Sequence, residues 1–206
     1  MRQLLAGLVV FLVVAFSRTA FAGYTHYWTW LKPPDAARVA TCLGEIEKVV
    51  RARPDLVADM NGATGADAKF HVSLPTRPDA GAPREAIVFN GIGAQAHEPF
   101  NFPGGPIFNF TKTLGKPYDA VVTAALIVAR TCFASDELQI ESDGNWEQWS
   151  EGRQLYAKTF GKDPPNVFVG DGGGSAPSAP KSWLLLGGLI AVSVIAWILA
   201  RSRRPT

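Results

Sequence analysis

Apolar residues in the middle of the chain recur at the spacing of three helices. The first helix is predicted over residues 35–53, where apolar residues fall on one face until a proline ends the pattern. Residues 118–132 are apolar around the whole circumference of a helix, which predicts a buried helix. Residues 146–160 carry aromatic residues near helical spacing with charged residues between them, so we interpret these aromatics as core packing rather than as a ligand cage.

Several other segments have the composition of strands. Residues 24–30 are rich in aromatic and β-branched side chains, 86–92 form a continuous apolar run typical of a central strand, and 137–141 alternate between polar and apolar. Residues 70–74 are a short strand candidate inside 59–84, a Gly-, Ala-, Asp- and Pro-rich segment that we interpret as a surface connection. We therefore expect an α+β or small α/β fold, one compact domain with about three helices on a small mixed sheet.

An apolar run precedes this domain and has the features of a secretory signal peptide. Residues 4–16 are apolar, follow the basic Arg2 and lead to the small-residue motif Ala20-Phe21-Ala22. We expect cleavage after this motif, so that residues 1–22 are a signal peptide and 23–170 are an extracytoplasmic globular domain.

A second apolar run follows the domain. Residues 183–200 carry no charge and precede 201–206, a segment with three arginines, which is typical of a transmembrane helix with a basic cytoplasmic tail. Residues 171–182, rich in Gly, Ser and Pro, are expected to be a linker. This arrangement predicts a single-pass protein of the bacterial cell membrane whose N-terminal domain lies outside the cytoplasm. The alternative is a sorting signal that is cleaved from the mature chain.

The charge of the domain differs from that of the whole chain. Five of the 20 Lys and Arg residues lie in the signal peptide and the tail, which leaves 15 against 18 Asp and Glu residues in 23–182. A mildly acidic domain with interspersed signs lacks the basic stripe that nucleic-acid binding requires, so we expect no nucleic-acid partner.

The chain has two cysteines, Cys42 and Cys132, and both lie in the predicted extracytoplasmic domain. An oxidising compartment allows them to form a disulfide. Two buried thiols on helix faces are an equally open alternative, because the sequence does not give the distance between the two Cα atoms.

Several signatures of enzymes and metal sites are missing from the sequence. It has no His-Glu-x-x-His motif, no cysteine pair at zinc spacing and no Gly-x-Ser-x-Gly motif, which disfavours zinc peptidases and serine hydrolases. Gly115-Lys116 lacks the upstream glycine spacing and the following Ser or Thr of a nucleotide-phosphate loop. We therefore predict no metal ligands and name no cofactor.

Five short blocks of the sequence resemble those of an uncharacterised bacterial protein family. They are Gly-Tyr-Thr-His-Tyr-Trp at 23–28, Phe-Asn-Gly at 89–91, His-Glu-x-Phe at 97–100, Thr-Lys-Thr-x-x-Lys-Pro-Tyr-Asp at 111–119 and Ser-Asp-Gly at 142–144. The resemblance spans nearly the whole predicted domain and implies a shared fold. The family carries no assigned activity, so it implies no role for any residue here.

Polar residues gather where the predicted elements begin and end, and ligands usually bind at strand ends of open α/β sheets. His97 and Glu98, in a loop rich in Pro and Gly, are candidates for a general acid-base pair, and Asp143 is the third candidate catalytic residue. The alternative for an adjacent His-Glu pair is structural hydrogen bonding alone.

Other polar residues are candidates for ligand binding. Lys112 and Lys116 precede the predicted helix at 118–132, whose first N–H groups would join the two ammonium groups in holding an anion such as phosphate or carboxylate. The alternative is that Asp119 stabilises the helix start and that the lysines are solvated. The full set of ligand-binding candidates is His26, Asn90, Lys112, Lys116 and Asp119.

The sequence leaves two classes of function open. The first is a membrane-anchored extracytoplasmic binding or interaction domain of a bacterial envelope protein, whose partner is another envelope protein or a small anionic ligand. The second is a hydrolase or transferase that acts on a small anionic or sugar-like substrate at the strand ends. A third possibility is a purely structural envelope protein. An exposed apolar patch favours a partner surface, whereas titratable residues gathered in a cleft favour an enzyme.

Overall fold

The computed structural model describes residues 24–74 and 83–168. Three helices lie in these ranges, α2 (Ala36–Arg51), α3 (Asp119–Cys132) and α4 (Ser150–Phe160), with two short 3-10 turns, η1 (Gly65–Asp67) and η2 (Gly93–Gln95). The strands are β1 (Thr25–Trp30), β2 (Val57–Ala58), β3 (His71–Ser73), β4 (Glu85–Gly91), β5 (Phe100–Phe102), β6 (Phe108–Lys112) and β7 (Leu138–Ser142). The predicted signal peptide, linker and membrane span lie outside the described residues.

The strands form two antiparallel sheets. One has the order β6-β1-β7, and the other pairs β4 with β2, β3 and β5. Ile87 in β4 faces His71 of β3 on one edge and Phe102 of β5 on the other, which confirms that this apolar strand is central. The α+β prediction is confirmed. The pairs among the described strands are all antiparallel, so the strands form two antiparallel sheets where the sequence predicted one mixed sheet.

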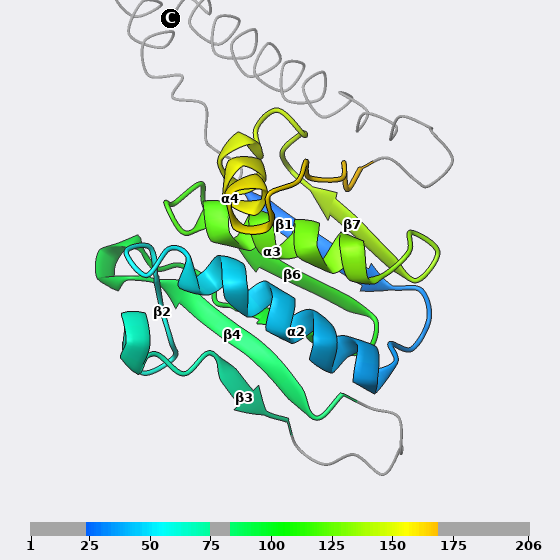
Figure 1. The fold of residues 1–206 in the computed structure, drawn as a ribbon, viewed down its shortest axis with the longest axis horizontal. Helices are drawn as coiled ribbons and strands as arrows, with labels where there is room; N and C mark the ends of the chain where they lie inside the picture. The colour runs from blue at the N-terminus through cyan, green and yellow to red at the C-terminus, as the bar shows by residue number, and fades with distance from the viewer. Residues whose placement is uncertain (1–23, 75–82, 169–206) are drawn as a thin grey trace, which may run out of the picture. The chain divides into compact units, whose positions relative to one another are not determined.

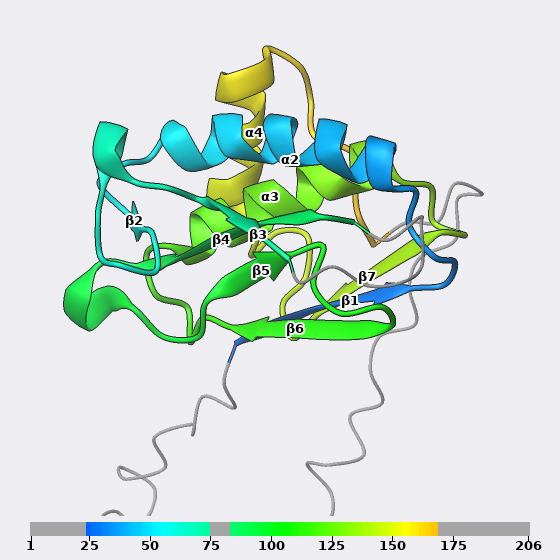
Figure 2. The ribbon, with the colours of Figure 1, turned by 90° about the horizontal axis from the view of Figure 1, so that it is seen from below.

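The helices cover one side of the strands. Figure 2 shows α2 and α4 on one side of the molecule and β6, β1 and β7 on the opposite side. In Figure 1, α2 and α3 lie side by side and α4 crosses α3. Every residue of α3 from 120 to 130 is buried, because α2, α4 and the strands surround this helix. The predicted burial of this apolar helix is therefore confirmed.

A disulfide joins two of these helices. Cys42 in α2 is bonded to Cys132 at the end of α3, with 5.9 Å between the Cα atoms and 90 residues of chain between them. A covalent bond across so long a segment restricts the unfolded chain and stabilises the fold by about 4–5 kcal/mol on the loop-entropy model.

Aromatic residues join the two sheets. The indole N–H groups of Trp28 and Trp30, which face inward from β1, donate to the carbonyl oxygen of Pro103 at 3.0 and 3.1 Å. The same rings pack on Phe100 and Phe102 of β5, with centroids 5.3 and 5.8 Å apart. Two large apolar rings are thus buried with their polar atoms satisfied, which fixes β5 against β1.

Some segments differ from the sequence prediction. The described residues of 59–84, a segment interpreted as a surface connection, include three buried side chains, those of Asp59, Ala68 and Phe70. The Asp59 carboxylate accepts backbone N–H bonds from within this segment, and these bonds hold the pKa of Asp59 below its usual range. The third helix begins at Ser150, later than predicted. None of the helices in the described ranges has the length and apolar character needed to cross a membrane.

The crossing of α3 and α4 provides a test of this packing. A Cβ at Gly152 would lie 2.0 Å from Thr123 Oγ1 and 2.9 Å from the Ala124 backbone nitrogen. We expect Gly152→Ala to lower the free energy of unfolding by about 1–3 kcal/mol, measured by urea denaturation. The matched control is Gly44→Ala in α2, where a Cβ has no neighbour within 4 Å, and it should stabilise the protein by about 0.5–1 kcal/mol. Equal effects of the two changes would contradict the packing described here.

Candidate functional site

His26 is at the centre of the most connected polar cluster. It lies in β1, where Trp28 and Trp30 also face the interior, and its side chain is fully buried. A buried imidazole needs hydrogen-bond partners for both ring nitrogens, because an unsatisfied buried polar group costs about 1–3 kcal/mol. The fold supplies both partners from segments that are distant in the sequence.

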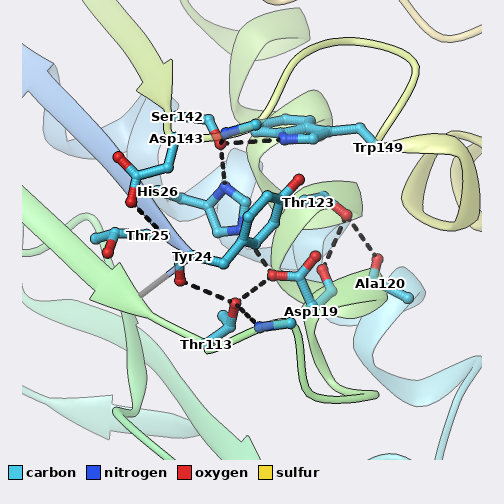
Figure 3. Close-up of polar contacts among 12 residues, drawn as sticks. Tyr24, Thr25, His26, Thr113, Asp119, Ala120, Thr123, Ser142, Asp143 and Trp149 are labelled. Carbon is cyan, nitrogen blue, oxygen red and sulfur yellow. Dashed lines mark hydrogen bonds and ion pairs between the residues drawn. The ribbon is translucent and has the colours of Figure 1, made fainter. Parts of the chain in front are cut away.

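The two partners of the His26 ring are an aspartate and a serine (Figure 3). Nε2 lies 2.7 Å from Oδ1 of Asp119, the first residue of α3, and Nδ1 lies 3.0 Å from Oγ of Ser142, the last residue of β7. His26 and Ser142 face each other directly in the β1–β7 register, so the sheet itself sets the second contact.

The other bonds of Ser142 determine where the protons lie. Its Oγ accepts the backbone N–H of Gly144 at 2.9 Å and the indole N–H of Trp149 at 3.4 Å. A hydroxyl oxygen has two lone pairs, so with both filled its own proton is left to donate. We therefore predict that the Ser142 hydroxyl donates to Nδ1 of His26, so that Nε2 carries the ring proton and donates to Asp119.

Asp119 connects this cluster to the loop before α3. Its Oδ1 also accepts a hydrogen bond from the Thr113 hydroxyl, and Thr113 N donates to the Tyr24 carbonyl at 2.9 Å. A carboxylate in the first turn of a helix is stabilised by the helix dipole. The sequence-based alternative that Asp119 stabilises the helix start is consistent with this position, and the His26 contact adds a second role.

Two aromatic rings cover the imidazole. Tyr24 and Trp149 both pack edge-on against His26, with ring centroids 5.0 and 5.1 Å away. Gly144 is required for this arrangement, since a Cβ there would lie 2.1 Å from the Tyr24 hydroxyl oxygen. Burial and, secondarily, the negative charge of Asp119 raise the pKa of Tyr24 to about 12. These rings leave no approach for a ligand to the His26 nitrogens.

Asp143 has its own partners next to this cluster. One carboxylate oxygen accepts the Thr25 backbone N–H at 3.0 Å, and the other accepts the Tyr27 hydroxyl at 3.2 Å. These bonds tie the end of β7 to β1. Asp143 is exposed, so it is accessible from solvent, although both oxygens already accept hydrogen bonds.

The candidates His97 and Glu98 contact the end of β6. His97 Nδ1 donates to the Lys112 carbonyl at 2.7 Å, and a Glu98 carboxylate oxygen accepts the Lys112 backbone N–H at 2.9 Å. Asn90 holds the same loop, because its side chain accepts from His97 N and donates to His97 O. The structure therefore brings Asn90, His97, Glu98 and Lys112 together as a hydrogen-bonded loop support.

The three candidate catalytic residues do not form one cluster. Asp143, Thr25, Lys112 and Glu98 lie in a row across the end of the β7-β1-β6 sheet. Neighbouring strands are spaced about 4.8 Å apart, so the backbones of Asp143 and Glu98 are separated by about 14 Å. A direct proton exchange between Asp143 and the His97–Glu98 pair does not fit this geometry.

The proposed anion site is partly occupied by the protein itself. Lys116 Nζ donates to the Ala94 carbonyl at 2.7 Å. The first N–H groups of α3, those of Asp119 and Ala120, already donate to the carbonyls of Lys116 and Pro117. The carboxylate of Asp119 adds negative charge at this helix start. These contacts weaken the anion-binding interpretation of Lys112 and Lys116.

An exposed apolar stripe lies along β6. Six large apolar side chains are exposed in the described residues, and all but Met60 lie on or beside this strand. Phe108 and Phe110 belong to β6 itself, and Phe108 stacks on Tyr27 of β1 with centroids 6.0 Å apart. We call the set the apolar stripe, and its members are Leu31, Ile107, Phe108, Phe110 and Leu114.

Several residues of this site had no direct signal in the sequence. Ser142 was named only as part of the block at 142–144, and Thr113 and Trp149 were not site candidates, because their roles depend on contacts across the fold. The apolar stripe, in contrast, had a recognisable pattern in the sequence. Phe108-Asn109-Phe110 alternates as a strand with one apolar face does, although alternation alone does not say whether that face is covered.

Comparisons with known proteins assign no family and no function to this chain. No family model, no curated protein and no solved structure matches this chain. The resemblance to the bacterial family described above therefore stays a prediction. Among residues 24–74 and 83–168, no three His, Cys, Asp or Glu side chains are grouped so that they could hold a metal ion.

The buried position of Tyr24 predicts a change of stability at high pH. A pKa raised from 10.0 to about 12 means that folding favours the protonated phenol, so this contribution is complete below pH 10.0 and is lost as the pH rises towards 12. We expect Tyr24→Phe to reduce the loss of unfolding free energy over this range, measured by urea denaturation at several pH values. An unchanged alkaline loss in the variant would contradict the burial of this hydroxyl.

Proposed function

We propose that this chain is a membrane-anchored extracytoplasmic binding domain whose binding surface is the apolar stripe along β6. The observation that carries the proposal is the gathering of nearly all exposed large apolar side chains of the described residues along one strand. Exposed apolar patches of this kind are typical of interaction sites, because each exposed ring costs free energy in water that only a partner recovers.

The arrangement of the polar candidates supports the same proposal. His26 is fully buried, and the Lys112 backbone holds His97 and Glu98, so these groups stabilise the fold at the end of the sheet. The Cys42–Cys132 disulfide is compatible with an oxidising compartment outside the cytoplasm. Two sequence predictions supply the export and the membrane anchor of this proposal, the signal peptide at 1–22 and the span at 183–200.

The second candidate function is a hydrolase, with residues other than the His97, Glu98 and Asp143 that the sequence suggested. The order Ser142, His26, Asp119 is that of a serine nucleophile, its base and the orienting carboxylate, although Ser142 meets Nδ1 rather than Nε2. Two observations favour the binding domain over this alternative. Ser142 Oγ already accepts two hydrogen bonds, and the rings of Tyr24 and Trp149 cover His26.

The proposal is tested by photocrosslinking in the bacterium that encodes the chain. Benzoylphenylalanine replaces Phe110 in one full-length variant and Met60 in another, since both native side chains are more than half exposed. We expect a covalent adduct with an envelope component from position 110 and none from position 60, because only the stripe is in contact with a partner.

Equal labelling at both positions, or no adduct at position 110 in cells that retain the chain in the membrane fraction, would contradict the proposal. Treatment of the full chain with a fluorophosphonate separates the two functions. Covalent modification of Ser142 would favour the hydrolase, and an unmodified Ser142 is expected for a binding domain.

A further inference from the structure

We propose that the apolar stripe rests on the lipid surface of the membrane that anchors the chain, with the rings of Phe108 and Phe110 at the boundary between headgroups and acyl chains. This inference rests on the proposed function and names the occupant of its binding surface. Four features of the described residues carry it: the chemistry of the stripe, its straight geometry, the conformation of Leu114 and the place where the described chain ends.

The apolar side chains of the stripe are suited to contact with the acyl chains of a lipid bilayer. Ile107, Phe108 and Phe110 are 65%, 55% and 53% exposed, and none of these side chains has a hydrogen-bonding group. The hydroxyl groups beside the rings are those of Tyr27 and Thr29 in β1, and the Tyr27 hydroxyl already donates to Asp143. Aliphatic and phenyl side chains are those that bury into the interfacial region of a bilayer when a protein lies on its surface.

The geometry of the stripe suits a flat surface. Phe108 and Phe110 pair with Thr29 and Tyr27 of β1, so they project from the same outer face of the sheet, away from the helices. The Ile107 carbonyl accepts the Trp30 N–H, so Ile107 lies opposite Trp30 at one end of β6. Leu114 lies just past the other end. The stripe therefore follows the length of one strand that, among the described residues, pairs only with β1.

Leu114 is held in an unusual conformation. Its φ is 54° and that of Gly115 is 64°, and Lys116 N donates to the Thr113 carbonyl at 3.2 Å, so a tight turn presents Leu114 at its tip. Asn or Gly is the usual residue in such a turn, and a left-handed leucine costs roughly 1–2 kcal/mol. The side chain is nevertheless 42% exposed. Insertion of Leu114 into a lipid surface accounts for both its strain and its exposure.

The charges near the stripe make a small contribution to membrane contact. Lys112 projects from the same face of β6 as Phe108 and Phe110, because alternate residues of a strand share a face. A lysine close to an anionic membrane contributes about 1 kcal/mol to binding. The carboxylates Glu141 and Asp143 belong to the β7 side of the sheet, across β1 from the stripe. On the stripe side, Glu98 accepts the Lys112 backbone N–H, so a carboxylate also lies close to this lysine and the edge carries both signs of charge.

A series of contacts links Phe168, the last described residue, to the Leu114 turn. Phe168 packs on Trp149 with centroids 5.0 Å apart, Trp149 packs on His26, and His26 packs on Tyr24, whose carbonyl accepts Leu114 N at 3.2 Å. The sequence from 169 to 182 then leads to the predicted span, and 14 residues reach at most about 50 Å. So short a tether gives a high effective concentration, so that weak surface contacts suffice.

The test uses the full chain in vesicles of phosphatidylcholine and phosphatidylglycerol. An environment-sensitive fluorophore is attached at Thr29→Cys, beside the stripe on the outer face, or at Met60→Cys as the control, and lipids with spin-labelled acyl chains serve as quenchers. The native cysteines are bonded to each other and do not react without a reductant. The same label at position 29 is measured with Phe108→Ser and Phe110→Ser together.

We expect about twofold stronger quenching at position 29 than at position 60, and its loss in the double serine variant, because the rings hold this face on the lipid. No quenching at position 29 in a chain that resists carbonate extraction would overturn the inference and leave the proposed function standing. A blue shift at position 29 that grows with protein density and is insensitive to the quencher would also overturn it, in favour of a second copy. Release of the chain by carbonate would instead contradict the membrane anchor of the proposed function.

Discussion

The hydrogen bond between His26 and Asp119 is the contact on which the end of this fold depends. It joins the middle strand of one sheet to the first residue of the most buried helix, across 93 residues of chain. Ser142 adds β7 on the other side of the ring, and Trp149 adds the segment before α4. Because each buried polar atom finds a partner here, β1, β7 and the start of α3 are fixed relative to one another.

The polar network and the apolar stripe have different roles in the domain. The polar residues at the strand ends are used in holding strands and loops together, with Asn90, His97 and Glu98 around the end of β6 and Asp143 across β1. The large apolar side chains that the fold leaves exposed to water lie mainly in the apolar stripe on the outer face. Binding at the stripe therefore requires no rearrangement of the buried network, and a strand held on one side by β1 presents its rings in a fixed geometry.

The sequence predicted most of the regular elements because their side-chain patterns are local. The all-round apolar character of residues 118–132 predicted a buried helix, and α3 is buried from 120 to 130. The strands β2, β5 and β6 were missed. Two or three residues carry too little periodicity in β2 and β5, and β6 directly follows a loop rich in Pro and Gly. Ser142 had the local features of a turn residue, and only the β1–β7 register places it opposite His26. Similarly, the alternation at 108–110 indicates an apolar face, but whether another layer covers that face is a property of the whole fold.

The most direct test of this account is the protonation of the His26 ring, measured by nitrogen-15 NMR of the folded chain at neutral pH. The account predicts a proton on Nε2 and none on Nδ1, because Asp119 accepts from the first and Ser142 donates to the second. That result would show that the buried polar groups at this end of the domain are hydrogen-bonded to its own side chains. A proton on Nδ1 would require Ser142 to accept three hydrogen bonds, and it would contradict the network and the division of roles built on it.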